Sequence, residues 1–202
     1  MPTLSQRSEQ WLSISSNASG PPPTFLDQLG EWSEIKHQIL DGYAQAYTTI
    51  LTRQRAIRRI VYIDAFAGSG VALDRATDEL PAGSPFRALR VNPPFDELHF
   101  VEQDPQKVDE LQHWVGNDSR VTIHEGDANQ VLISDVLPRC RYEDFARGLC
   151  FLDPYGLSVE WNLLTTIAQC EAWRSSSISW LLARIAMCCG AIRHGSRRND
   201  VN

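Results

Sequence analysis

The sequence predicts an α/β fold of the doubly wound type, in which helices cover both faces of a mostly parallel β-sheet. Short apolar runs rich in β-branched residues are typical of strands buried on both faces, and four such runs occur. Between them lie stretches whose apolar residues recur at the three- and four-residue steps of a helix. Strands that alternate with helices favour right-handed crossovers between parallel strands.

The composition fits one soluble globular domain. The chain has 202 residues, of which 43% are hydrophobic and 22% are charged, so it can form a packed core. No apolar run reaches the roughly 18 residues of a membrane-spanning helix, and the N-terminus lacks the pattern of a secretory signal. The five cysteines include no CxxC pair: Cys140, Cys150, Cys170, Cys188 and Cys189. We therefore expect a cytoplasmic protein with no disulfide scaffold, no metal site and no membrane contact.

Charge is distributed unevenly along the chain. The net charge is −6, yet residues 174–202 hold five arginines against Asp200 alone, which leaves −10 on the first 173 residues. Affinity for nucleic acid comes largely from basic groups that neutralise phosphates. An acidic body therefore argues against broad, sequence-blind binding to nucleic acid, although a local basic groove is still compatible with it.

The N-terminal part of the chain divides into a leader and a helix. Residues 1–30 are rich in Ser, Pro, Gly and Asn, which predicts a loose leader. From residue 32 to about residue 54 the apolar side chains follow helical spacing, with Ser33 as the expected N-cap.

Four strands and their helices follow in order. The predicted strands cover residues 59–64, 98–102, 121–124 and 148–153. The predicted helices cover residues 86–91, 105–115, 129–137 and 160–169. Ser84-Pro85 and Asp104-Pro105 are the expected starts of the first two, because proline is favoured at the first helical position. The polar stretch 71–83 is either an ordinary insertion or a lid beside the neighbouring glycine turn.

Each predicted strand ends at, or just before, an acidic residue. These residues are Asp64, Glu102, Asp127 and Asp153. In an open parallel sheet, ligands bind beyond the carboxyl ends of the strands, near the switch in strand order. Acidic residues after strands also serve as ordinary turn formers and helix caps. Their recurrence after four successive strands predicts a single acid-lined cleft.

A glycine-bearing turn follows the first strand. Gly68 and Gly70 permit unusual dihedral angles and close approach of the backbone to a ligand. A dinucleotide site would need a third glycine near position 73, where Leu73 stands, and a phosphate-binding loop would need a following Lys-Ser or Lys-Thr. A nicotinamide-dependent oxidoreductase is therefore a weaker hypothesis.

The turn and the strand-end acids together resemble the class I S-adenosylmethionine-dependent methyltransferases. The resemblance implies that Asp64, Gly68 and Gly70 lie on the methionine side of S-adenosylmethionine, with Phe66 in the same cofactor-binding loop. It places Glu102 at the ribose hydroxyls and Asp127 with Ala128 at the adenine. The residue types suit these roles, because hydroxyls and an amine donate hydrogen bonds that carboxylates accept. A positively charged sulfonium also favours an acid-rich cleft.

The end of the fourth strand, Asp153-Pro154-Tyr155-Gly156, resembles the Asp/Asn-Pro-Pro-Tyr/Phe motif of methyltransferases that modify nucleobase amines. The resemblance implies catalytic roles for Asp153, Pro154 and Tyr155. The Asp153 carboxylate and the Pro154 carbonyl would accept hydrogen bonds from the acceptor amine, and Tyr155 would stack on the base. This chain has one proline where the motif has two, and a plain Pro-Tyr-Gly turn is the alternative interpretation.

Longer strings resemble the three-Cys-motif partner proteins, a bacterial and phage-associated family that is methyltransferase-like and occurs beside a separate three-cysteine protein. They are residues 61–70 (VYIDAFAGSG), 83–89 (GSPFRAL), 94–104 (PFDELHFVEQD), 126–129 (GDAN) and 151–157 (FLDPYGL). The similarity covers roughly residues 31–172 and implies a three-cysteine-motif partner. A methyltransferase-like domain is then expected at 31–183.

The end of the chain departs from that family. Residues 177–183 could form a fifth strand, after which the family resemblance implies further strands. The remaining basic tail, 184–202, is too short for them, so we hypothesise a truncation or a shifted reading frame.

Two functions from different classes follow. The leading hypothesis is a methyltransferase that uses S-adenosylmethionine and acts on an amine of a nucleic-acid or nucleobase-containing acceptor. The alternative is a non-catalytic methyltransferase-fold partner of a three-cysteine-motif protein.

Overall fold

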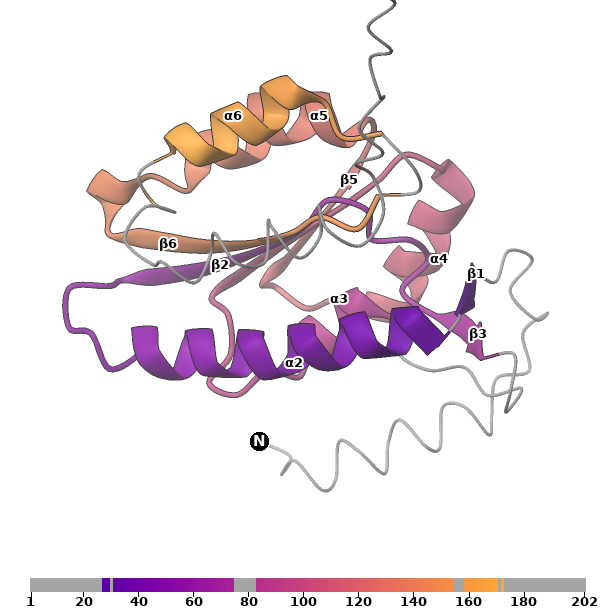
Figure 1. Cartoon of the computed structure of the whole chain (residues 1–202), viewed down its shortest axis with the longest axis horizontal. Coiled ribbons are helices and arrows are strands. Elements are labelled where there is room, and N and C mark those ends of the chain that lie inside the picture. Colours follow the sequence, from indigo (N-terminus) through magenta and orange to yellow (C-terminus); the bar gives the residue numbers. More distant parts are fainter. Residues whose placement is uncertain (1–26, 30, 75–82, 155–157, 171, 173–202) are drawn as a thin grey trace, which may run out of the picture.

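The computed structural model describes residues 27–29, 31–74, 83–154, 158–170 and 172 (Figure 1). The predicted leader up to residue 26, Tyr155, the possible fifth strand at 177–183 and the basic tail lie outside this part of the chain. Within the described part, no helix is both long and apolar enough to cross a membrane.

Four strands form one parallel sheet in the order β5-β4-β2-β6. They are β2 (Arg59–Asp64), β4 (Glu97–Glu102), β5 (Val121–Glu125) and β6 (Ala146–Phe151). β2 lies at the centre, with Val61 opposite Glu97 of β4 and Gly148 of β6. All four coincide with predicted strands to within two residues at each end, and the predicted parallel α/β architecture is confirmed.

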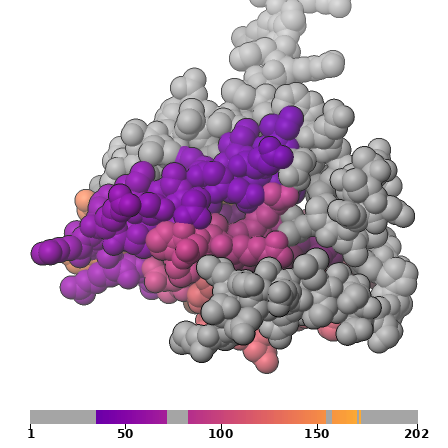
Figure 2. Space-filling model, turned by 90° about the horizontal axis from the view of Figure 1, so that it is seen from below, coloured from indigo at the N-terminus to yellow at the C-terminus, as the bar shows by residue number. Residues whose placement is uncertain are grey.

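Helices cover both faces of this sheet. One face carries α2 (Glu31–Leu51), α3 (Ser84–Leu89) and α4 (Pro105–Val115), and the other carries α5 (Ala128–Val131) and α6 (Trp161–Gln169) (Figure 1). Figure 2 shows the first face from below, with the indigo to violet atoms of α2 running across it. The sheet is therefore wound on both sides, as the sequence predicts.

The two faces bury separate apolar clusters. Beneath α2 and α4, Tyr62 packs against Phe95 and Phe100 with ring centroids 5.2 and 6.4 Å apart, and Leu40 and Leu111 join them. Beneath α5 and α6, the opposite side chains of the same strands pack with the helices: Val61, Ile63, Val101, Leu132 and Leu163. Alternate residues of β2 thus serve opposite cores, which explains its continuous apolar run.

Two predicted helix caps are wrong. Ser33 lies inside α2, which begins at Glu31. Ser84 is the first residue of α3, and Gly83 is its N-cap. Pro85 then occupies the second helical position. A backbone N–H is dispensable there too, because the carbonyl four residues earlier, which would accept its hydrogen bond, lies outside the helix. The Asp104 prediction is confirmed, since its side chain accepts a hydrogen bond from Gln106 N at the start of α4.

The segment predicted as a helix over 129–137 is less regular than expected. After α5 it widens into a π-helical turn, η1 (Leu132–Val136), and then tightens into a 3₁₀ turn, η2 (Leu137–Arg139). Two further strands were not predicted: β1 (Asp27–Leu29) and β3 (Ala72–Asp74) pair in parallel as a small separate sheet. β1 belongs to the segment expected to be a loose leader, and β3 to the polar stretch after the glycine turn.

Candidate functional site at the carboxyl edge of the sheet

The four strand-end acids lie at one edge of the sheet, because all four strands run in the same direction. Backbone hydrogen bonds link the segments that leave this edge. Ala65 N donates to Phe151 O at 3.1 Å, and Ala67 N donates to Val101 O at 2.9 Å. Gly126 N donates to Glu102 O, also at 2.9 Å. The turns after β2, β4, β5 and β6 therefore form one continuous surface.

The direction of winding reverses between β2 and β6. The chain proceeds outward from β2 to β4 and β5 and then returns to place β6 on the other side of β2. A reversal of this kind leaves a crevice beyond the strand ends, where ligands bind in open α/β sheets. Asp64 ends β2, and Asp153 follows β6 by two residues. These two carboxyls therefore lie on either side of the switch point.

Asp64 is fully buried. Its Oδ1 accepts a hydrogen bond from Phe66 N at 3.3 Å, its Oδ2 lies 3.5 Å from the Tyr62 hydroxyl, and the Ser84 side chain also bonds to it. Burial raises the pKa of Asp64 from its ordinary 3.8 to about 7. The bonds from Ser84 and Phe66 oppose this rise, whereas the negative charge of Asp153 adds to it. Asp64 can thus exchange a proton near neutral pH.

Asp153 forms an ion pair with Lys36, a residue that no sequence motif marks. Lys36 Nζ lies 2.7 Å from Oδ1 and 2.6 Å from Oδ2, so one nitrogen contacts both oxygens of the carboxylate. Both side chains are partly exposed, at 25% for Lys36 and 34% for Asp153. Asp153 is therefore accessible from solvent and already has an amine nitrogen as its partner.

The packing of α2 on β6 explains why these two residues meet. Near the other end of the helix, the buried Tyr47 hydroxyl donates to Gly148 O at 2.9 Å. Lys36 and Tyr47 are eleven residues apart in a helix, which spans about 16 Å. Gly148 and Asp153 are five residues apart in an extended chain, which also spans about 16 Å. The two contacts are therefore equally spaced along the helix and along the β6 segment, which run antiparallel to each other.

Glu102, predicted to contact ribose, holds the glycine turn. Its Oε2 accepts a hydrogen bond from Gly68 N at 2.9 Å, and its Oε1 accepts from Gln103 N and Asp104 N at 2.8 and 2.9 Å. A carboxylate has about four lone-pair sites, so these three donors leave one of them for a ligand hydroxyl. Glu102 therefore has a clear structural role, and its contact with ribose stays a prediction.

Asp127 and Ala128, predicted to contact adenine, start α5. The Asp127 side chain caps the helix by accepting from Asn129 N and Gln130 N at 2.9 and 3.2 Å, and Ala128 is buried. Asn129 then ties this turn to the segment after the fourth strand. Its amide donates to Ser158 O at 2.9 Å and accepts from Glu160 N at 2.8 Å. Asn129 belongs to the string 126–129 quoted for the family resemblance, but no pattern in the sequence predicts that its amide bridges two loops.

The glycine turn is explained in part by packing alone. Gly68 and Gly70 have positive φ angles of 64° and 80°. A Cβ on Gly70 would lie 2.6 Å from the Phe86 ring and 2.8 Å from Leu111, too close for any side chain. Phe66, predicted on the cofactor side, is half-buried and packs against the apolar cluster beneath α5 and α6. Pro154 is also half-buried.

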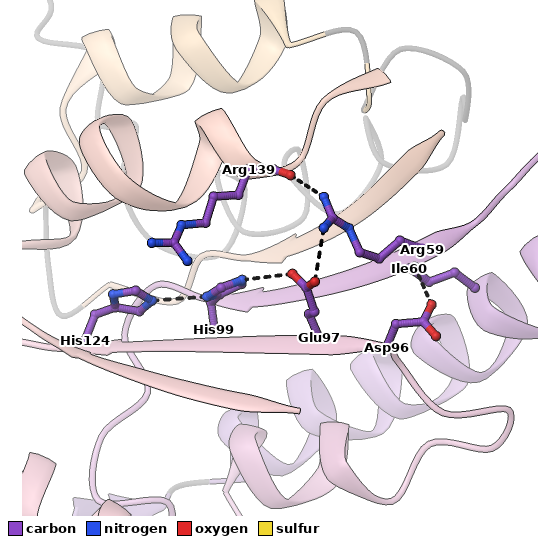
Figure 3. Close-up of polar contacts among 7 residues, drawn as sticks. All are labelled: Arg59, Ile60, Asp96, Glu97, His99, His124 and Arg139. Atoms are coloured by element: carbon purple, nitrogen blue, oxygen red, sulfur yellow. Dashed lines mark hydrogen bonds and ion pairs between the residues drawn. The ribbon is translucent and has the colours of Figure 1, made fainter. Parts of the chain in front are cut away.

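A second polar network crosses the strands beneath α5 (Figure 3). His124 Nε2 and His99 Nδ1 are 3.1 Å apart, His99 Nε2 lies 3.6 Å from Glu97, and Glu97 accepts a hydrogen bond from Arg59 at 3.1 Å. Burial lowers the pKa of both imidazoles. The two rings are therefore neutral at pH 7 and can share one hydrogen bond. No group of three potential metal ligands occurs within the described part of the chain.

A shallow hollow of about 200 Å³ lies elsewhere, between the end of α4 and the start of β5. Its lining residues are Gln112, Val115, Gly116, Asp118, Val121 and Ile123. Val121 begins β5, whereas Asp127 lies just beyond the end of that strand. The hollow is therefore at the opposite end of the sheet from the strand-end acids.

Comparisons with known proteins assign no family. No protein-family model matches the chain, and no curated protein matches it. Among solved structures, it is similar to protein LPL1258 from Legionella pneumophila str. Philadelphia 1, of the family DUF519, with 18% identity and a TM-score of 0.44. The match covers 60% of this chain and 55% of that one, so this chain matches little more than half the length of the Legionella protein.

Proposed function

We propose that the protein binds S-adenosylmethionine at the carboxyl edge of the sheet and transfers its methyl group to an amine of a nucleic-acid or nucleobase-containing acceptor. The observation that carries this proposal is the switch in strand order between β2 and β6, with Asp64 and Asp153 on either side of it. Open α/β sheets bind ligands at this place. The similarity of the sequence strings to the three-Cys-motif partner proteins points to the same chemistry.

The strand-end acids fall into two groups, one that would bind the cofactor and one that would bind the methyl acceptor. S-adenosylmethionine supplies an electrophilic methyl group on a positively charged sulfur. Glu102 would accept a hydrogen bond from one ribose hydroxyl through its remaining lone pair, and Asp127 with Ala128 would bind the adenine. Asp64, in its ionised form, would face the positively charged part of the cofactor, with Phe66, Gly68 and Gly70 forming the adjoining turn.

Asp153 would orient the acceptor. An aromatic amine is a poor nucleophile because its nitrogen shares its lone pair with the ring. Hydrogen bonds from its two N–H groups to Asp153 and to the Pro154 carbonyl would favour a pyramidal nitrogen that directs its lone pair outward. Orientation of this kind contributes to the rate by fixing the reacting atoms in place. The ion pair with Lys36 supports the assignment, since the Nζ atom of this lysine contacts both oxygens of the Asp153 carboxylate.

The family resemblance supports a further part of the proposal, namely a three-cysteine-motif protein as partner. That protein would contribute the acceptor or the surface that binds it. The net charge of −10 on residues 1–173 fits such a division, because affinity for nucleic acid comes largely from basic groups.

The test combines a binding and a transfer experiment. Calorimetry with S-adenosylmethionine should show one site, weakened about tenfold or more in Glu102→Gln. Transfer of a labelled methyl group to DNA, RNA and the partner protein should then be lost in Asp153→Ala and retained in Asp109→Ala, a matched change on the exposed side of α4. Binding without transfer to any acceptor would favour the non-catalytic partner. Equal transfer by wild type and Asp153→Ala would refute the role of Asp153.

A further inference from the structure

Lys36 occupies the place that the proposed function gives to an acceptor amine. Its Nζ atom lies 2.6 and 2.7 Å from the two oxygens of Asp153, at the switch point of the sheet. The position is fixed, since Tyr47 attaches the same helix to β6 at Gly148. The chain therefore presents one of its own amines to the residue expected to orient amines.

The residue type at this position is unusual for this chain. Of its 19 basic residues other than histidine, only Lys36 and Lys107 are lysines. Four other ion pairs among the described residues use arginine: Arg59–Glu97, Arg87–Asp41, Arg120–Asp118 and Arg141–Glu143. An arginine could make the same pair with Asp153, with better geometry. A guanidinium stays charged, whereas a lysine amine can lose its proton and then has a free lone pair on nitrogen.

We propose that Lys36 is a site of self-methylation, at which the protein transfers a methyl group from S-adenosylmethionine to its own Nζ atom. This inference rests on the proposed function. The ammonium first gives a proton to a base in solution. The freed lone pair then forms the N–C bond while the C–S bond breaks, and its electron pair stays on sulfur. The products are S-adenosylhomocysteine and a methylated lysine that regains its positive charge.

The experiment uses the purified full chain with S-adenosylmethionine carrying a labelled methyl group, and peptide mass spectrometry locates the label. Lys36 should be labelled in wild type and in Lys107→Arg, the matched control on α4. Lys36→Arg, which can keep the ion pair, should lose the label. Asp153→Asn should lower it about tenfold or more, because it removes the charge that holds the nitrogen.

The outcomes separate this inference from the proposed function. If calorimetry shows that the protein binds S-adenosylmethionine but Lys36 stays unlabelled, self-methylation is refuted and the methyltransferase proposal stands. Equal labelling of Lys36 and Lys107 would show direct chemical methylation by the reagent, which also refutes the inference. If wild type does not bind S-adenosylmethionine, both proposals are wrong.

Discussion

Replacing Asp64 with asparagine should change how the stability of the protein depends on pH. The folded protein resists ionisation of Asp64, because burial raises its pKa from 3.8 to about 7. The unfolded chain has no such resistance. As the pH rises from about 4 to about 7, the unfolded state loses this proton first, so the free energy of unfolding of the wild type falls. Above about pH 7 the loss is complete.

The size of the effect follows from these two pKa values. Their difference corresponds to about 4 kcal/mol, since each pH unit contributes about 1.4 kcal/mol. Between about pH 5 and about pH 8, integration of the proton difference gives about 2.5 kcal/mol. The asparagine of the Asp64→Asn variant is neutral at every pH, so the variant should gain that amount relative to the wild type over this interval.

Urea unfolding followed by circular dichroism at both pH values measures this quantity directly. Asp109→Asn is the matched control, because Asp109 is exposed and should leave the pH dependence unchanged. If the Asp64 variant and the wild type differ by the same free energy at about pH 5 and about pH 8, then Asp64 titrates normally. Burial would then not control the ionisation of this carboxyl, and the reasoning would be refuted.

Three further predictions concern packing and protonation. Gly70→Ala should destabilise the fold by about 2 kcal/mol or more, because its Cβ would clash with Phe86, whereas Gly42→Ala should stabilise it by about 0.5–1 kcal/mol, because open space surrounds that position of α2. Tyr47→Phe should cost about 1 kcal/mol in thermal or urea unfolding through loss of the bond to Gly148 O. Acidification below the ordinary histidine pKa of 6.5 should destabilise the protein, since the folded state resists protonation of His99, and His99→Gln should reduce this loss in a pH series of urea unfolding.

Each of these expectations has a result that contradicts it. A neutral Gly70→Ala would mean that the turn can shift away from Phe86. An unchanged stability in Tyr47→Phe would mean that water replaces the lost donor at the carbonyl. Identical acid sensitivity of wild type and His99→Gln would place the responsible group elsewhere.

The strands and the acids at their ends could be predicted because both are local properties of the sequence. A parallel strand buried on both faces needs a continuous apolar run. In β2 this run ends at Asp64, the last residue of the strand. The start of α4 was predicted for a similar reason, since Asp104 meets its hydrogen-bond partner only two residues away. Where the physical cause lies within a few residues, the sequence shows it.

The features that were missed depend on contacts between distant parts of the chain. Lys36 and Asp153 are 117 residues apart, and no pattern in either segment predicts that they meet. The burial that raises the pKa of Asp64 comes from packing between distant segments. The sequence predicts only that a strand ends at this residue. The errors at Ser33 and Ser84 have a different origin. Serine is favoured at the N-cap but is also tolerated in the first turn, so its presence alone does not fix the residue at which a helix begins.

The hydrogen bond between Gly83 N and Gly70 O, 2.9 Å long, has a consequence for how this chain can vary. It holds the two ends of the intervening segment, Gly70 and Gly83, next to each other. The entropy cost of a closed loop grows only slowly with its length. Insertions and deletions between Asp74, the last residue of β3, and Gly83 should leave the geometry of the strand ends intact. The length of this segment can thus change without rebuilding of the sheet.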